Sequence, residues 1–346
     1  VEMESMTRSG SSVAGGIVLL AVASGIAACG RLTDESPPLA HVRIAIGGQN
    51  QMVYLPTTLA EELGFYKAEG LDVELQDFQG GAKALQALVG GSADVVSGFY
   101  DHTIQMAAEG RELVAFVNTL RFPGLVLTTS PQVAATVTKI EDLKGRMVGV
   151  TAAGSSSQMF LTFLLTRNNV PADAVSVTAI GSAATAIASI EHGKVDAGWL
   201  ADPSFTFVTR RNPSVRVLAD LRDEAGVKAA FGTTSYPASV LYSTSAWVGA
   251  NRDVTRKLAR ATLQTLQWMH GHSAAEIAAK TPTALRGEDD ALYVEALKSS
   301  MPMFSTNGEM TDDGAAAVHR LLAGTMEKVR RASIDLSKTY TNEFLR

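Results

Sequence analysis

From His41 onward the chain alternates short apolar runs with longer stretches in which apolar residues recur at helical spacing. The first segments of this pattern are VRIAIG, YLPTTLAEELGFYKAEG, LDVELQDF, GGAKALQALVGG and ADVVSGF. The short β-branched runs predict buried strands, and the longer periodic ones predict helices. Gly64 and Gly70 stand where a helix C-cap and the turn after it favour glycine. Alternating strands and helices predict βαβ units around a mainly parallel sheet.

A second series with the same order of elements begins after Leu143. Its segments are GRMVGV, SSSQMFLTFLLTRNNV, VSVTAIG, SAATAIASIEHG and KVDAGWLAD. When the two series are superposed, Gly91 aligns with Gly193 and Asp94 with Asp196. Two similar lobes built on one βαβ unit explain this match, although two unrelated βαβ units would share much of the pattern.

Two long extended stretches, each interrupted by a proline, follow the two series. The first is LVAFVNTLRFPGLVLTTSP with Pro123, and the second is FGTTSYPASVLYSTSAWV with Pro237. From residue 251 onward the pattern is helical and has no strand signal. The extended stretches predict two crossings of the chain between two lobes, with lobe 1 at 41–122 and 240–346 and lobe 2 at 123–239.

The first 29 residues differ from the rest, because the apolar stretch VAGGIVLLAVASGIAAC follows Arg8. This stretch is too short and too rich in small residues for a membrane-spanning helix, and it is typical of a signal peptide. Its end, IAAC, resembles the lipobox of bacterial lipoproteins, although an ordinary secretory signal with an incidental cysteine is the alternative. We therefore expect a lipoprotein signal peptide at 1–29, lipidation at Cys29 and a polar tether at 30–40. Cys29 is the only cysteine, so the chain forms no internal disulfide.

Composition and charge narrow the class of function. The chain has 346 residues, 46% of them hydrophobic, and a formal net charge of −5. It is therefore long enough for two domains with a substantial core, and it lacks the basic runs that a nucleic-acid partner requires. Neither a G-x-S-x-G nor an H-E-x-x-H motif occurs. We expect no catalytic residues, no metal and no cofactor.

Polar and aromatic residues stand directly after the predicted strands. Since carboxyl ends of parallel strands meet at one edge, where open α/β sheets bind ligands, these residues are expected to line a crevice between the lobes. The candidate ligand-binding residues are Gln49, Asn50, Gly80, Gly81, Tyr100, Asp101, Arg121, Ser155, Ser156, Trp199 and Asp202.

Several of these candidates have a purely structural alternative. Tyr100 and Trp199 fit a hydrophobic core equally well. Asp202 is also a good N-cap, because Pro203 follows it at the position that favours proline. Arg121 could form a salt bridge with Asp101 instead of binding a ligand.

The loop GSSS at 154–157 joins a predicted strand to a predicted helix. Its N–H groups and hydroxyls lie at the positive end of the helix, which favours an anion. Gly149 and Gly154 have the spacing of a nucleotide-binding loop, but Ser155 and Ser156 stand where that loop requires lysine and a serine or threonine. Nucleotide hydrolysis is therefore excluded, and the alternatives are an anion site or a plain serine N-cap.

Five segments and the lipobox together carry a family resemblance. The segments are PTTLAEELGFYKAEGLDVEL, GGAKALQALVGGSADVV, KIEDLKGRMVGV, GSSSQMFLTFLL and HGKVDAGWLADP. Over roughly Val42 to Ser245 the chain resembles the bacterial solute-binding proteins of the NMT1/THI5-like family, which includes binders of nitrate, sulfonates, taurine and pyrimidine precursors. The helical C-terminal third carries no distinctive motif.

The resemblance implies an α/β protein with the type II periplasmic-binding-protein fold, in which two lobes with a cleft are joined by two hinge strands. It implies a monomer that is lipid-anchored in the periplasm or at the cell surface. Such a protein captures a small organic anion in the interlobe cleft and delivers it to an ABC permease of the inner membrane. In the taurine-like members an acidic residue at the place of Asp202 holds the amino group of the solute. No arginine stands near Ser155, so an aromatic or heterocyclic carboxylate fits as well as a sulfonate or nitrate.

Other members of the same family suggest alternatives. One is a binder of pyrimidine precursors, and another is a THI5-like biosynthetic enzyme. Those enzymes carry a cysteine-rich motif, whereas the sole cysteine here, Cys29, lies in the lipobox. A sensor lobe that reports a ligand to a membrane kinase is a third alternative.

Overall fold

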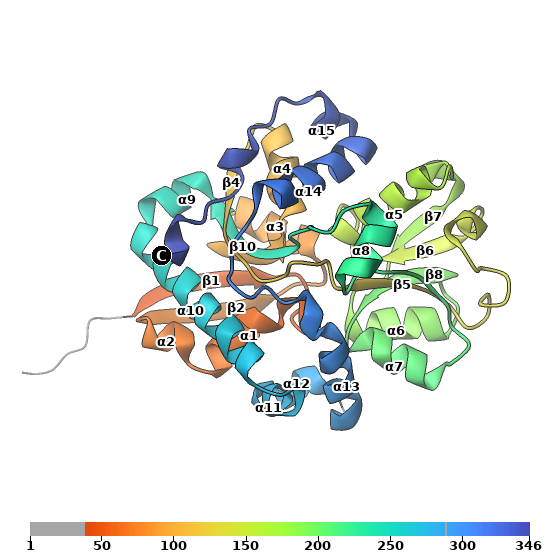
Figure 1. The fold of residues 1–346 in the computed structure, drawn as a ribbon, viewed down its shortest axis with the longest axis horizontal. Coiled ribbons are helices and arrows are strands. Elements are labelled where there is room, and N and C mark those ends of the chain that lie inside the picture. Colours follow the sequence, from red (N-terminus) through yellow and green to blue (C-terminus); the bar gives the residue numbers. More distant parts are fainter. Residues whose placement is uncertain (1–38, 288) are drawn as a thin grey trace, which may run out of the picture. The chain divides into compact units, whose positions relative to one another are not determined.

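The computed structural model describes residues 39–287 and 289–346. The expected signal peptide, Cys29 and most of the tether lie outside the described residues. The described part of the chain contains two five-stranded sheets with helices packed on both (Figure 1). None of its helices has both the length and the apolar character that a membrane span requires.

The first sheet has the strand order β2-β1-β3-β10-β4. β1 pairs in parallel with β2 and β3, whereas β10 runs antiparallel between β3 and β4. The predicted strands β1 and β3 are therefore largely buried inside the sheet, whereas β2 at its edge is mostly exposed or half-buried. Its strands are β1 (Ala40–Ile46), β2 (Leu71–Asp77), β3 (Val95–Phe99), β4 (Leu113–Asn118) and β10 (Ser239–Thr244).

The second sheet repeats this wiring with the order β7-β6-β8-β5-β9. β6 pairs in parallel with β7 and β8, and β5 runs antiparallel between β8 and β9. Each sheet thus receives its antiparallel strand directly after a chain crossing, which is the two-lobe architecture that the resemblance implies. The strands are β5 (Leu125–Thr129), β6 (Met147–Val150), β7 (Ser176–Ala179), β8 (Ala197–Ala201) and β9 (Val217–Asp220).

The two aspartates that align in the sequence repeat have the same structural role. The Asp94 carboxylate accepts hydrogen bonds from the backbone N–H and the side chain of Arg43. The Asp196 carboxylate accepts from the backbone N–H of Met147 and, at 3.4 Å, from Arg146. Each aspartate therefore ties the residue before one strand to the parallel neighbouring strand, and the sequence repeat corresponds to a repeat in structure.

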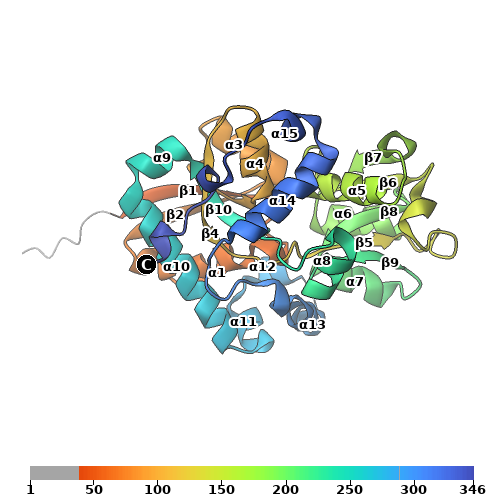
Figure 2. The same ribbon diagram turned by 45° about the horizontal axis from the view of Figure 1, so that its top comes forward.

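Helices cover both faces of each sheet (Figure 2). On the first sheet, α3 and α4 lie on one side, and α1, α2 and α10 lie on the other. The expected helix after β1 is two helices, because the chain turns at Gly64 with a φ of +73°. The helices of this lobe are α1 (Leu55–Glu62), α2 (Phe65–Ala68), α3 (Gly81–Val89), α4 (Asp101–Ala108) and α10 (Arg252–Gly271).

The second sheet is covered by α5 and α8 on one face and by α6 and α7 on the other. Successive side chains of β8 point to opposite faces of this sheet. Trp199 belongs to the large core that includes α5, and Leu200 belongs to a smaller core with α6 and α7. These helices are α5 (Ser156–Arg167), α6 (Ala183–Glu191), α7 (Ser204–Arg211) and α8 (Glu224–Phe231).

The C-terminal helices contact both lobes, although the sequence gives them no distinctive motif. α14 packs against α4 and α5, and α13 packs against α7. Thr311 caps α14 as its sequence position suggests, since its hydroxyl accepts from the N–H of Gly314. The helices of this region are α9 (Ser245–Ala250), α11 (Ala274–Lys280), α12 (Thr283–Arg286), α13 (Asp290–Ser300), α14 (Asp312–Thr325) and α15 (Glu327–Arg331).

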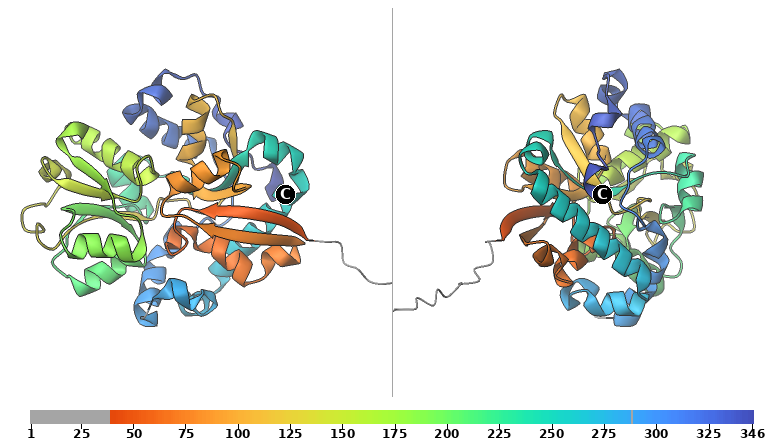
Figure 3. Two further views of the ribbon diagram at one scale, coloured as in Figure 1. Left: turned by 180° about the vertical axis from the view of Figure 1, so that it is seen from behind. Right: turned by 60° about the vertical axis from the view of Figure 1, so that its left-hand side comes forward.

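The two chain crossings lie side by side between the sheets, as the views in Figure 3 allow the reader to follow. The N–H of Thr119 donates to the carbonyl of Ser239 at 2.8 Å, and the N–H of Ala238 donates to the carbonyl of Leu120 at 2.8 Å. Leu120 also forms a bridge with Phe304 from the C-terminal region. The sequence expectation of two hinge strands is therefore confirmed, and a third segment supports them.

Candidate interlobe binding site

A small cavity lies where the strand ends of the two lobes meet. Its volume is about 20 Å³. The first lobe contributes Gly47, Gln51, Tyr54, Gly81 and Phe99, and the second contributes Leu125, Thr151, Ser155, Ser156 and Ser157. The lobes are therefore closed on each other here. A solute larger than a water molecule requires them to move apart or the lining side chains to rearrange.

The GSSS loop forms the second-lobe wall of this cavity. Ser155 stands at the N-cap of α5, but its hydroxyl donates to the carbonyl of Ala152 at 2.7 Å instead of capping the helix. The hydroxyl of Ser157 accepts from the backbone N–H of Thr151 at 3.0 Å. Two of the three serines therefore hold the loop in shape, and Ser155 does not form the plain serine cap that was one of the two alternatives.

The third serine makes a contact between the lobes. The hydroxyl of Ser156, at the start of α5, donates to Oδ1 of Asp101 at 2.9 Å. Asp101 is the first residue of α4 in the other lobe, and only 1% of its surface is exposed. A carboxylate of the protein itself therefore lies beside the helix end at which the sequence predicts an external anion.

Burial dominates the electrostatics of this contact. It raises the pKa of Asp101 to about 7, and the hydrogen bond from Ser156 offsets part of that rise. Burial also lowers the pKa of the neighbouring His102 to about 4, so its ring is neutral at pH 7. Nε2 of His102 lies 3.9 Å from Oδ1 of Asp101, which is beyond hydrogen-bond distance.

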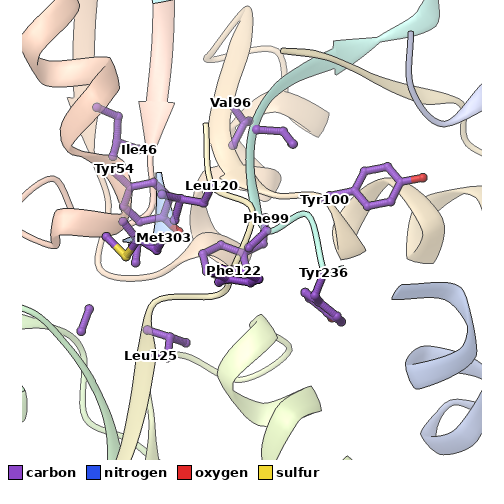
Figure 4. Close-up of a cluster of buried hydrophobic side chains, with 14 of the residues drawn as sticks. Ile46, Tyr54, Val96, Phe99, Tyr100, Leu120, Phe122, Leu125, Tyr236 and Met303 are labelled. Carbon is purple, nitrogen blue, oxygen red and sulfur yellow. The ribbon is translucent and has the colours of Figure 1, made fainter. Parts of the chain in front are cut away.

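Aromatic side chains surround the site. The ring of Phe160 packs edge-on against Trp199 and Tyr236, with ring centroids 6.1 Å and 5.6 Å apart. Its centroid lies 6.2 Å from that of Phe99. Figure 4 shows Phe99, Phe122 and Tyr236 in the buried cluster near the crossing strands. Trp199 is 1% exposed, so it contributes to the core, and its indole N–H has no partner within residues 39–287 and 289–346.

Asp202 lies at a different junction between the lobes. Oδ1 accepts from the backbone and hydroxyl of Thr206, and Oδ2 accepts from Arg222 at 3.0 Å and from Ser300 at 2.9 Å. Both oxygens thus have protein partners. The helix that follows begins at Ser204, with Pro203 at its N-cap, so the proline stands one position earlier than the sequence suggests.

Three further candidates point to partners outside the small cavity. The hydroxyl of Tyr100 is 2.5 Å from that of Thr339, and its ring points away from Phe99 (Figure 4). Gln49 donates from its backbone to Asp77 at 2.6 Å. Arg121 donates to the carbonyl of Pro302 at 3.1 Å and lies over the Phe122 ring, so it does not form the suggested pair with Asp101.

Gly80 and Gly81 bring the first-lobe backbone close to its surroundings. Gly80 has a φ of +135°, and a Cβ there would lie 2.9 Å from the Cβ of Ala152 in the other lobe. A Cβ at Gly81 would lie 3.1 Å from the His102 ring. Larger side chains at this loop would therefore prevent closure.

A larger groove lies beside the cleft, and of the expected site residues only Asn50 lines it. It has a volume of about 910 Å³ and is formed by the first turns and sides of α6 and α7, by Asn50, and by residues 284, 285, 287, 289 and 292. We place the candidate site at the small cavity because Gly81, Ser155 and Ser156 of the expected site residues line it.

Some lining residues were not predicted. Gln51 and Tyr54 follow the predicted pair Gln49 and Asn50 in the chain. Tyr54 is the last residue of the turn Met52–Tyr54 that precedes α1, and Gln51 is the residue before that turn. The only sequence signal for these two residues is that the loop between the first strand and the first helix continues beyond Asn50. His102 is buried against Tyr242, with Nδ1 at 3.3 Å from the hydroxyl, and its position after a strand was a usable indication. In the described ranges, no group of three His, Cys, Asp or Glu side chains is arranged to hold a metal ion.

Comparison with known proteins gives a consistent family. The model of the family described as NMT1/THI5 like matches residues 51–275. A solved protein from Bordetella bronchiseptica RB50 is 38% identical, with a TM-score of 0.85, and the match covers 88% of this chain and 96% of that one.

Two more distant structures have the same fold. The alkanesulfonate-binding protein SsuA from Xanthomonas axonopodis pv. citri, bound to MOPS, is 17% identical with a TM-score of 0.70, over 89% of this chain and 100% of that one. The periplasmic nitrate-binding protein NrtA from Synechocystis PCC 6803 is 14% identical with a TM-score of 0.70, over 88% of this chain and 87% of that one.

Proposed function

Because the chain belongs to the NMT1/THI5-like family, we propose that it is the extracytoplasmic solute-binding protein of an ABC importer. In this role it captures a small organic solute between its lobes and delivers it to a permease of the inner membrane. The observation that carries the proposal is the cavity at the strand ends, which residues of both lobes line beside two paired crossing segments. The protein acts as a monomer and by binding, not by catalysis.

Closure of the lobes is the mechanism that this geometry supports. The Ser156–Asp101 contact and the Met52–Asp202 backbone bond, at 2.8 Å, both join residues of different lobes. Each such bond contributes about 1 kcal/mol, which is small enough for the lobes to open. A solute that contacts both lobes adds its binding energy to the closed form and shifts the population toward it.

Two features of the cleft favour different solute charges. The N-terminus of α5 favours an organic anion, such as a sulfonate, taurine, nitrate or an aromatic carboxylate, which is the class that the sequence predicts. Asp101, buried beside that helix end, favours a positively charged group instead. A pyrimidine precursor is the alternative solute on the basis of the family.

The test is a thermal-shift screen of the purified chain against taurine, alkanesulfonates, nitrate, aromatic carboxylates, amines and pyrimidines. A solute at a hundred times its Kd stabilises the protein by about 2.7 kcal/mol, so one class is expected to raise Tm by several degrees. Sodium chloride at equal ionic strength is the control. If no class raises Tm above that control, the assignment as a solute receptor for these classes is contradicted.

We further propose that a lipid on Cys29 anchors the protein to a membrane. The change Cys29→Ser is then expected to move the protein from the membrane fraction to the soluble fraction, because the thioether that carries the lipid cannot form. Fractionation of cells that express either form, followed by immunoblotting, measures this. Retention of the serine variant in the membrane fraction would favour the ordinary secretory signal or a different anchor.

A further inference from the structure

Asp101 is a buried carboxylate whose hydrogen bonding is incomplete. Oδ1 accepts from Ser156 across the lobe boundary, whereas Oδ2 has no hydrogen-bond partner in the described ranges. The residue is 1% exposed, so bulk solvent does not reach it in the closed form. A buried carboxylate without a compensating charge is costly, and proteins normally pair such groups.

Two arginines at or near the lobe boundary are already engaged elsewhere. Arg222 binds the carboxylates of Asp220 and Asp202. Arg121 binds the carbonyl of Pro302. The imidazole of His102 follows Asp101 in the chain, but burial keeps it neutral and its Nε2 is 3.9 Å from Oδ1 of Asp101. Below about pH 7 protonation relieves the cost of burying Asp101. The ionised form has no cationic partner in the described ranges, so a positive group from outside the protein would compensate it.

Aromatic rings around Asp101 are suited to a positive group. Tyr54 and Phe99 line the same cavity as Ser156, the partner of Asp101. Burial, and then the negative charge of Asp101, raises the pKa values of Tyr54 and Tyr236, whereas burial, then Tyr54, then Asp101 raise that of Tyr242. The hydroxyl of Tyr236 also has no partner among the residues that the structure describes. A carboxylate among aromatic rings is the arrangement that recognises organic ammonium ions, through an ion pair and cation–π attraction.

We propose that the interlobe cleft binds a small organic ammonium ion, whose N–H group donates to Oδ2 of Asp101 while Ser156 continues to donate to Oδ1. This inference rests on the proposed function and specifies the charge of its solute. It reverses the sign expected from the helix end alone: Asp101 already occupies the neighbourhood of the α5 N-terminus and repels a second anion.

The experiment uses probes that share a skeleton and differ in head group. Benzylamine, benzyl alcohol, benzoate and benzenesulfonate form the aromatic series, and propylamine and propionate form the small series. Calorimetric titration of the purified full chain at pH 8 is expected to show binding of an amine, with at least tenfold lower affinity for the neutral and anionic members of its series. Preference for benzoate, benzenesulfonate or propionate would overturn the inference and leave the proposed function standing.

Two variants show whether Asp101 is responsible. Asp101→Asn keeps the size of the side chain and an acceptor for Ser156, and it is expected to reduce amine affinity at least tenfold. The matched control Asp142→Asn makes the same change in the turn Ile140–Leu143, which does not line the cavity, and amine affinity should stay within about threefold of the wild-type value. Unchanged amine affinity in Asp101→Asn would overturn the inference.

The pH dependence supplies a second readout. His102, Tyr54, Tyr236 and Tyr242 are the other titratable groups around Asp101, and they are neutral between pH 6 and pH 8. Amine affinity is therefore expected to rise from pH 6 to pH 8 as Asp101 ionises, and this rise should be absent in Asp101→Asn. If no probe of either charge binds, the result counts against the inference and the proposed function together.

Discussion

Replacing Ala152 with tryptophan is expected to reduce solute affinity at least a hundredfold while leaving the two lobes folded. Ala152 is 5% exposed, and it lies against Gly80 of the other lobe so closely that a Cβ at Gly80 would be 2.9 Å from its own Cβ. An indole has no space there while the lobes are closed. When the lobes separate, the same position faces solvent. The substitution therefore removes the closed form, and a hundredfold loss corresponds to a population shift of about 2.7 kcal/mol.

The measurement combines titration of whichever solute stabilises the wild-type chain with small-angle X-ray scattering. The tryptophan variant should have a larger radius of gyration that the solute does not reduce. Ala152→Ser is the matched control, because serine adds one oxygen and should change affinity by less than about tenfold. Wild-type affinity in the tryptophan variant would mean that the solute binds without closure at this loop.

The arrangement of the lobes could be predicted from local pattern. The alignment of Asp94 with Asp196 indicated a repeated βαβ unit, and in the structure both aspartates tie neighbouring strands together. The role of the C-terminal helices could not be predicted. Their apolar faces indicate that they pack against other elements but not which ones. α14 packs against α4 and also against α5 of the other lobe, and these partners are set by the three-dimensional arrangement of the lobes.

The site could be predicted only in part, because strand ends indicate location but not orientation. Ser155, Ser156 and Gly81 line the cavity as their positions suggest. Tyr100 stands next to Asp101 in the sequence, yet its ring points to Thr339, because successive residues at a helix start face different directions. The family resemblance implied that Asp202 holds an amino group of the solute, and in the structure its oxygens accept from Thr206, Arg222 and Ser300. Arg222 and Ser300 are distant from Asp202 in the sequence, so these contacts could not be predicted from the local pattern.

Replacing Asp101 with asparagine is expected to stabilise the solute-free protein at pH 8 and to change little at pH 4. Burial raises the pKa of Asp101 to about 7, above the ordinary value of 3.8. Below pH 4 the carboxyl is protonated in both the folded and the unfolded chain, so it does not lower the free energy of unfolding. As pH rises, the unfolded chain releases the proton first, and folding stability falls until the folded carboxyl has ionised above pH 7. The amide removes this penalty, which amounts to as much as ~4 kcal/mol.

Urea unfolding of both proteins at several pH values between 4 and 8 measures this difference, which should widen steadily with pH. Asp142→Asn is a control of opposite sign. Hydrogen bonds from Thr138 hold the pKa of Asp142 below its usual value, so its substitution should lower stability at pH 8 rather than raise it. If Asp101→Asn destabilises the protein at pH 8, the carboxylate has a compensating partner in solution, and the ammonium inference loses its basis. If it stabilises the protein while abolishing amine binding, loss of binding cannot be attributed to unfolding.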